Sequence, residues 1–333
     1  MPSADSPKKF LVLRFSSIGD IVMTTPVVRC LKQQVPGAVV HFATKNQYRF
    51  LVESNPYVDK VFGLGESIPD LARELDAEGY DAVIDLHNNL RTWRLGRAMQ
   101  PVPTYRFDKL NLKKYLLTAF KINVMPVGIH ASDRFLATVE RFGVKNDGLG
   151  QDFFIPPADE VSPDALPETH RRGYVAYAIG AQQATRQLPL PKMIELCGKI
   201  RRPLVLLGGK VDEANAEGIV EALNNPLIFN AVGKFNFNQS ASLIRQAQLV
   251  YAHDTGLAHV AAALKKRVVF ILGNTVIPFG MYPYATEKVV WEVNGLWCRP
   301  CSKIGYDRCP LRHHRCMNDQ KLDVAAMERK TGW

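Results

Sequence analysis

The chain has 333 residues, of which 47% are hydrophobic and 22% are charged, and this composition excludes a disordered or collagen-like protein. The length suits two domains of ordinary size. The formal net charge of +10 favours an anionic partner, but charge alone does not choose between a nucleic acid, a membrane surface and a small anionic molecule.

The start of the chain predicts no secretion signal. Residues 1–9 are polar and lead directly into a strand-like run, without the apolar stretch of a signal peptide. No apolar run is long enough to span a bilayer. We therefore expect a cytoplasmic location.

Strand-like and helix-like segments alternate through the first half of the chain. Thr25 followed by Pro26 is typical of an N-cap with proline at the first helical position, which predicts that the first helix begins there and continues to Gln34. The expected strands are 10–15, 39–43, 58–62 and 82–86, and the other expected helices are 46–54 and 68–78. This order is typical of a parallel sheet covered by helices.

Residues 156–172 interrupt the alternation with four prolines among acidic residues, and they are the best candidate for a linker. The alternation then resumes, with expected strands 174–179, 204–207, 227–230, 249–252 and 268–272 and expected helices 192–200, 212–223, 239–247 and 256–265. The sequence thus predicts an α/β protein with an N-terminal domain (1–157), a linker (158–172) and a C-terminal domain (173–333). Two such domains usually hold a ligand in a crevice at the carboxyl ends of their strands.

The first motif that can carry chemistry is Ser16-Ser17-Ile18-Gly19-Asp20, a turn that follows the opening strand. Gly19 allows a ligand to approach the backbone closely. Asp20 can act as a general base, or it can simply cap the next helix, and spacing alone favours the cap. The chain has no G-x-G-x-x-G fingerprint, which argues against a Rossmann dehydrogenase.

The second motif, His253-Asp254-Thr255-Gly256-Leu257-Ala258-His259, joins an apolar strand to an alanine-rich helix. The backbone amides of Thr255, Gly256 and Leu257 can bind a pyrophosphate at the helix N-terminus. His259 lies one turn further on the same face. An ordinary capped helix with a buried histidine explains the pattern equally well.

Two further polar residues follow strands of the second domain. Arg186 lies in a polar loop and can neutralise phosphate charge, although it can also be a solvated surface residue. Glu213 can accept hydrogen bonds from ribose hydroxyls, or it can be a favourable acid in the first turn of a helix.

Four of the six cysteines, Cys298, Cys301, Cys309 and Cys316, fall close together near the end of the chain. The Cys-x-x-Cys spacing of the first pair is typical of zinc ligands, while the later gaps are irregular. A zinc site and packed metal-free thiols are about equally favoured, and a disulfide is less favoured in a reducing compartment.

Taken together, Ser-x-Gly-Asp near the start and Asp-Thr-Gly-x-x-His-x-Ala-Ala-Ala from Asp254 resemble glycosyltransferase family nine, the ADP-heptose:lipopolysaccharide heptosyltransferases. The resemblance extends over nearly the whole chain. It implies a GT-B fold, in which two Rossmann-like domains face a central cleft with the acceptor on the N-terminal domain and the nucleotide-sugar on the C-terminal domain. Similar cysteine-rich tails occur in this family.

The resemblance also implies roles for individual residues. Asp20 matches the catalytic base, and the segment from Asp85 to Arg91 matches one that faces the acceptor, although His87-Asn88 stands where Gln-Gly is usual. Gly273-Asn274-Thr275-Val276 replaces the usual Gly-Pro-Thr-Asp. The implied acceptor contacts are Ser17, Gly19, Asp85, His87 and Arg91, and the implied donor contacts are Arg186, Glu213, Asp254, Thr255, Gly256, Leu257 and His259.

The resulting hypothesis is an inverting, metal-independent transferase that moves a heptose or related sugar from an ADP-sugar to a lipopolysaccharide core acceptor. No cofactor is required in this hypothesis, since preorganised charge can replace a metal ion and no Asp-x-Asp motif is present. The basic clusters at 91–97, 109–121 and 299–315 predict peripheral attachment to the inner face of the inner membrane. The alternatives are another nucleotide-sugar donor, and a basic nucleic-acid-binding protein with a zinc module.

Overall fold

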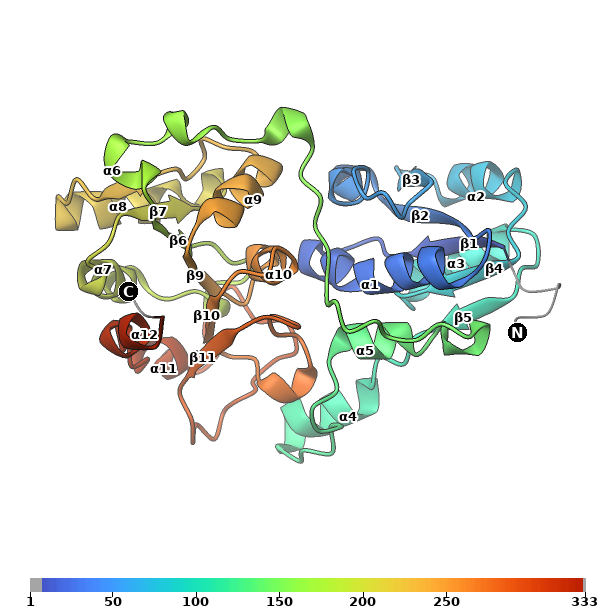
Figure 1. The fold of residues 1–333 in the computed structure, drawn as a ribbon. Coiled ribbons are helices and arrows are strands. Elements are labelled where there is room, and N and C mark those ends of the chain that lie inside the picture. The colour runs from blue at the N-terminus through green and yellow to red at the C-terminus, as the bar shows by residue number, and fades with distance from the viewer. Residues whose placement is uncertain (1–7, 332–333) are drawn as a thin grey trace. The chain divides into compact units, whose positions relative to one another are not determined.

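The structure, a computed structural model, describes residues 8–331 of the chain. The chain divides into two compact units (Figure 1). The first contains the chain up to Leu110 together with Gly128–Phe154, and the second contains Asn111–Val127 and the chain from Ile155 onward. Residues 111–127 therefore leave the first unit, belong to the second, and are followed by a return to the first.

The first unit is built on a five-stranded parallel sheet with the strand order β3-β2-β1-β4-β5. β1 is apolar and fully buried over Phe10–Leu13, as expected for a strand covered on both faces. The strands of the first unit are β1 (Lys9–Leu13), β2 (Val39–Lys45), β3 (Lys60–Leu64), β4 (Ala82–Asp85) and β5 (Thr104–Arg106). The helices of this unit are α1 (Ile18–Gln34), α2 (Ile68–Asp76), α3 (Leu90–Ala98) and α5 (Ala131–Leu136), together with the 3-10 turns η1 (Asn46–Leu51) and η3 (Glu140–Phe142).

Helix α1 begins eight residues earlier than the sequence predicts, at Ile18 and not at Pro26, and the prediction of an N-cap at Thr25 is wrong. Pro26 lies inside the helix, where it has no N–H to donate to the carbonyl of Val22. The hydroxyl of Thr25 donates to that carbonyl instead, at 2.8 Å. The Thr-Pro pair thus allows the helix to continue through the proline.

The second unit contains a six-stranded parallel sheet with the order β11-β10-β9-β6-β7-β8. Its strands are β6 (Val175–Ala178), β7 (Leu204–Leu207), β8 (Ile228–Asn230), β9 (Leu249–His253), β10 (Val268–Leu272) and β11 (Lys288–Glu292), and its main helices are α7 (Leu190–Lys199), α8 (Glu213–Leu223), α9 (Phe237–Gln246), α10 (Gly256–Ala263), α11 (Arg315–Asn318) and α12 (Val324–Thr331). Alternate strand residues face opposite layers: Tyr177 packs with α7 and α8, whereas Ala178 packs with α9 and α10.

Short helical segments complete the second unit, and several of them replace the expected linker. Residues 158–172 include buried Val161 and Leu166, which pack into the core beside α9, so this stretch is part of the unit rather than an open tether. The short elements are α4 (Asn111–Tyr115), the π-helical η2 (Leu116–Phe120), η4 (Pro157–Asp159), η5 (Pro163–Ala165), α6 (Glu168–Arg171), η6 (Ala184–Arg186), η7 (Lys210–Asp212) and η8 (Ile277–Phe279).

Both sheets have a point where the strand order reverses, and this point locates the candidate sites. It lies between β1 and β4 in the first sheet, where Leu13 pairs with Asp85, and between β6 and β9 in the second, where Ala178 pairs with Ala252. Open parallel sheets bind ligands outside the carboxyl ends of the strands at such a point. Across the described residues, no helix has the length and apolar character needed to cross a membrane.

Candidate functional site

The first site lies where β1 and β4 end. β1 continues into Arg14 and the turn before α1, while β4 ends at Asp85 and continues into His87. Asp20 is in the first turn of α1, and its carboxylate forms an ion pair with Arg14, with Nη2 to Oδ1 at 2.6 Å. Arg14 is held in turn by the backbone carbonyls of Ser16 and Leu86, so the ion pair is fixed to the ends of both strands.

The other oxygen of Asp20 accepts from the Ser17 hydroxyl at 2.7 Å and from the Ser17 amide at 3.2 Å. Asp20 therefore does cap helix α1, which was one of the two roles predicted for it from the sequence. Burial acts to raise the pKa of the Asp20 carboxyl, but the Arg14 guanidinium and the bonds from Ser17 outweigh it and hold the pKa below its ordinary value. Asp20 is therefore ionised at neutral pH and can still accept a proton.

The segment after β4 brings the other predicted acceptor residues to the same site. Asp85 is buried and accepts from the amides of His87 and Asn88, and Arg106 lies 3.6 Å from its second oxygen. Burial, followed by the charge of Arg14, lowers the pKa of His87 to about 3, so this ring is neutral. The charges of Lys109 and Arg91 also act to lower the pKa of His87, and Arg91 lies in the first turn of α3, which follows this segment.

Ser17 and Gly19 also lie at this end of the sheet, on either side of the start of α1. Gly19 is buried in the first turn of the helix, while Ser17 is the residue before it. Sequence-predicted residues of the first unit are thus gathered in one place, at the edge where β1 and β4 end.

The second site lies at the end of β9, where Asp254, Thr255 and Gly256 lead into α10. Thr255 is the N-cap, the first turn of α10 contains no acidic residue, and, among the described residues, the Thr255 side chain makes no capping hydrogen bond. Leu257 and His259 are buried in the helix. This helix start therefore keeps its positive end without a charge of its own to neutralise it.

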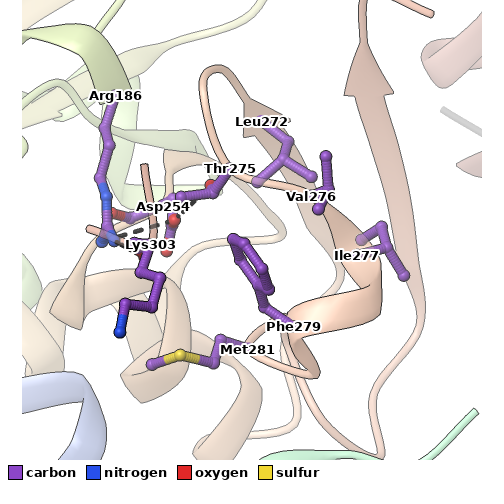
Figure 2. Close-up of a pocket in the computed structure, with 9 residues that line it drawn as sticks. All are labelled: Arg186, Asp254, Leu272, Thr275, Val276, Ile277, Phe279, Met281 and Lys303. Atoms are coloured by element: carbon purple, nitrogen blue, oxygen red, sulfur yellow. Dashed lines mark hydrogen bonds and ion pairs between the residues drawn. The ribbon is translucent and has the colours of Figure 1, made fainter. Parts of the chain in front are cut away.

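Arg186 lies beside this helix start, as Figure 2 shows. Its Nη1 is 3.4 Å from Oδ2 of Asp254, and the Thr275 hydroxyl donates to the same oxygen at 2.8 Å. The Arg186 side chain is 16% exposed and that of Asp254 is 8% exposed, so the guanidinium is the more accessible partner. Asp254 is therefore placed to orient Arg186 and Thr275.

The Asp20–Arg14 pair shows the opposite order of exposure. There the carboxylate side chain is 18% exposed and the guanidinium 9%. The first site thus presents an anion to solvent and the second presents a cation, although both contain one aspartate and one arginine.

Glu213 and Asp212 lie at the start of α8. Glu213 is exposed, and a Cβ on Gly233 would come within 2.2 Å of its Oε1. A Cβ on Gly180 would come within 2.4 Å of Asp212 Oδ2, so a glycine at the end of β6 leaves room for the Asp212 carboxylate. Asp212 accepts from the amide of Gly209 and fixes the turn after β7.

His253 precedes the Asp-Thr-Gly turn and is a core residue. Its Nε2 accepts from the amide of Leu188 at 3.1 Å and lies 3.2 Å from the Tyr177 hydroxyl. Burial lowers the pKa of His253 to about 4, so the ring is neutral and ties β9 to the chain before α7.

Sequence reasoning missed the residues that hold the Arg186 loop. The hydroxyl of Thr185 is 2.8 Å from the amide of Tyr306, and Arg186 Nη2 donates to the carbonyl of Lys303 at 3.4 Å. Phe279 and Met281 line the pocket beside Arg186 (Figure 2). These residues are far from Arg186 in sequence and belong to no motif, so no sequence signal identifies them.

Cys298, Cys301, Cys309 and Cys316 line one pocket with His313 and His314, and all four carry free thiols. Burial raises the pKa of Cys316 to about 12, which keeps this thiol protonated. Within residues 8–331, no three His, Cys, Asp or Glu side chains converge as a bound metal ion requires. Structural zinc is bound by side chains that converge on one point, so the zinc site expected from the cysteine spacing stays a prediction.

Comparison with known proteins identifies the family. The model of glycosyltransferase family 9 (heptosyltransferase) matches residues 68–309. The chain belongs to glycosyltransferase family 9. The match includes the segment after β4, Arg186 and the start of α10, whereas Asp20 lies before the matched residues.

Individual relatives agree with this assignment. Lipopolysaccharide heptosyltransferase 3 of Escherichia coli K12 is 23% identical, with 93% of this chain and 92% of that protein covered. Lipopolysaccharide heptosyltransferase 1 of Campylobacter coli is 23% identical, with 80% and 84% covered. The solved structure of E. coli ADP-heptose lipopolysaccharide heptosyltransferase II has a TM-score of 0.69 at 21% identity, with 96% of this chain and 99% of that chain covered.

The family assignment confirms two predictions from the sequence. The protein is a glycosyltransferase of the heptosyltransferase family, and its fold is GT-B with two Rossmann-like domains. The nucleic-acid-binding alternative receives no support from these relatives.

Proposed function

We propose that this enzyme transfers a heptose from ADP-heptose to a saccharide of the lipopolysaccharide core, with inversion at the anomeric carbon. The relatives are named for lipopolysaccharide heptosyl transfer, and one similar E. coli heptosyltransferase was solved with ADP and with ADP-2-deoxy-2-fluoro heptose. The observation that carries the proposal is the reversed exposure of the two Asp–Arg pairs, which gives the reaction a base in one unit and an anion site in the other.

The donor diphosphate is assigned to the second unit. The acid-free start of α10 supplies the amides of Thr255, Gly256 and Leu257, and Arg186 supplies a positive charge beside them. The attraction between Arg186 and the diphosphate becomes stronger as the sugar–phosphate bond breaks, because the leaving ADP gains negative charge. In the proposal these groups do the work of a metal ion, and Glu213 accepts from the ribose hydroxyls.

The acceptor is assigned to the first unit. Asp20 takes the proton of an acceptor hydroxyl while the oxygen of that hydroxyl forms a bond to the anomeric carbon and the bond from that carbon to the diphosphate oxygen breaks. The products are the elongated saccharide, ADP and a protonated Asp20, which releases its proton to water. Arg14 and Ser17 hold the carboxylate in place, and Asp85, His87 and Arg91 contact the acceptor.

A lipopolysaccharide acceptor lies in a membrane, so we also propose peripheral attachment of the enzyme to the inner face of the inner membrane. The basic clusters at 91–97, 109–121 and 299–315 support this proposal. Vesicle sedimentation should show binding to anionic lipid that weakens as salt increases. No sedimentation with anionic vesicles at low salt would contradict it.

The test of transfer uses purified enzyme, ADP-heptose and a core saccharide that lacks heptose. Mass spectrometry should show addition of one heptose, and NMR of the product should show the inverted anomer. ADP-glucose and UDP-glucose serve as competing donors. Transfer from one of these but not from ADP-heptose would reject the proposed donor, and a retained anomeric configuration would reject the role of Asp20.

A further inference from the structure

Large exposed apolar side chains concentrate in residues 111–127, which we call the docking segment. Of the fifteen exposed large hydrophobic residues described in the structure, six lie in this stretch: Leu112, Tyr115, Phe120, Ile122, Val124 and Val127. Exposed apolar residues are unremarkable when they are scattered, but a contiguous group marks an interaction surface. Nothing in the proposed catalytic machinery uses these side chains.

The docking segment is a built structure with an inner and an outer side. α4 and η2 form a continuous helical stretch from Asn111 to Phe120, which ends at Lys121 in the left-handed conformation. Leu117 and Met125 are buried, and the ammonium group of Lys121 donates to the carbonyl of Pro300 at 2.7 Å. Figure 1 shows α4 beside the chain that follows β10.

Because Leu117 and Met125 face inward, the outer side carries the exposed side chains of Leu112, Tyr115 and Phe120. The rings of Tyr115 and Phe120 contact each other edge to face, with 5.8 Å between centroids. Leu112 is 71% exposed on the same helical stretch, three residues before Tyr115. Side chains at this spacing lie on one face of a helix.

The charge around the docking segment identifies its partner. Residues 109–132 contain four lysines, at positions 109, 113, 114 and 121, and no aspartate or glutamate. Apolar and aromatic side chains next to lysines are typical of helices that lie in the interface of an anionic bilayer. A second copy of the chain would bring two sets of lysines together, so like-charge repulsion disfavours a dimer through this surface.

We propose that the docking segment binds an anionic lipid bilayer by inserting Leu112, Tyr115 and Phe120 between the headgroups while the exposed Lys113 faces lipid phosphates. The inference deepens the proposed function, because it rests on an acceptor that is presented at a membrane. It adds an apolar contribution to the salt-sensitive attachment proposed above. Binding should therefore decrease with salt to a plateau and not to zero.

The test measures sedimentation of the full-length enzyme with phosphatidylcholine vesicles that contain or lack phosphatidylglycerol. Leu112→Ser combined with Phe120→Ser should weaken binding about ten-fold or more at all salt concentrations and should abolish the plateau. Lys113→Gln should weaken binding a few-fold at low salt only, and only with phosphatidylglycerol present. Val211→Ser, a change at a 92% exposed valine elsewhere in the second unit, is the matched control and should leave binding unchanged.

Other outcomes would overturn the inference. Unchanged vesicle binding by the Leu112 and Phe120 variant would do so, provided that its thermal unfolding matches the wild type. So would gel filtration showing that the wild type is a dimer which this variant dissociates. Transfer to a lipid-free core saccharide is measured in parallel. If the wild-type enzyme transfers no heptose to it, the proposed function is rejected, while the sedimentation result still decides whether the docking segment binds lipid.

Discussion

Helices α1 and α10 each begin beside the reversal of strand order in their own parallel sheet, α1 after β1 and α10 after β9, yet they present opposite charges. The first turn of α1 contains Asp20, whose carboxylate bonds back to Ser17 and occupies the helix start. The first turn of α10 contains no acid. In the proposed function, one helix start therefore holds the general base and the other binds the diphosphate.

The arginines explain why neither aspartate behaves like its counterpart. Arg14 lies under Asp20 and keeps it ionised, so the less exposed member of that pair is the cation. Asp254 lies behind Arg186, so the less exposed member of that pair is the anion. In each pair, the more exposed side chain determines the charge that a substrate would contact: the carboxylate of Asp20 in the first pair and the guanidinium of Arg186 in the second.

The largest expected effect comes from neutralising Asp20. Asp20→Asn should lower kcat for heptosyl transfer by about 10²–10⁴-fold, because it removes the proposed general base, while ADP affinity stays nearly unchanged. Asp70→Asn is the matched control, since Asp70 is also three residues after a serine N-cap, in the first turn of α2. Equal losses in both variants would show that Asp20 acts only as a cap.

A second prediction concerns stability at acidic pH. His253 in the second unit and His87 in the first are buried and neutral, with pKa values lowered to about 4 and about 3, whereas the same rings in the unfolded chain titrate near 6.5. The unfolded state therefore binds protons first as pH falls. Between about pH 6.5 and 4, each ring should lower the free energy of unfolding by ~1.4 kcal/mol per pH unit.

Denaturant unfolding over this pH range measures that slope. Burial also lowers the pKa of His41, His170 and His314, which add to the slope in the same direction. His253→Gln should remove the contribution of that ring and leave that of His87, and the reverse holds for His87→Gln. A wild-type stability that does not change from pH 6.5 to 4.5 would contradict the neutral, buried state of both rings.

The smallest effect should come from giving α10 the acid that α1 already has. Thr255→Asp should cap the helix at least as well as threonine and should leave thermal stability unchanged or slightly raised. The new charge should weaken ADP binding about ten-fold by repelling the diphosphate. The Thr255→Asn variant is the control, since asparagine has the shape of aspartate without its charge, and it should bind ADP like the wild type in isothermal titration calorimetry. Equal ADP affinities of the wild type and both variants would show that the diphosphate does not bind at this helix start.

Sequence patterns predicted the parts of the fold that depend on local hydrophobic runs. The buried strands β1, β4, β7 and β10 stand out as short apolar stretches between turns, and the turns after β1 and β9 stand out by composition. The strand β11 was not predicted, because four of its five residues are only partly buried and no alternation of buried and exposed residues emerges.

Features that depend on distant contacts were not predictable in this way. The start of α1 was missed for a local reason instead: the Thr25 hydroxyl satisfies the carbonyl of Val22, which allows the helix to continue through Pro26. The assignment of residues 111–127 to the second unit depends on contacts such as that of Lys121 with Pro300, which are far apart in sequence. The partners of the Arg186 loop, Lys303 and Tyr306, were not predicted either, because they are more than 100 residues away in the sequence.

Two hydrogen bonds of the Arg186 loop have a consequence for biosynthesis: the amide of Tyr306 donates to the Thr185 hydroxyl, and Arg186 donates to the carbonyl of Lys303. On the ribosome, the strands and helices that surround the arginine emerge well before residues 303–306. The guanidinium therefore receives its last anchors only after nearly the whole polypeptide has been made. Under the proposed function, a nascent chain that ends before residue 303 lacks these anchors and should not hold the donor diphosphate in the mature geometry.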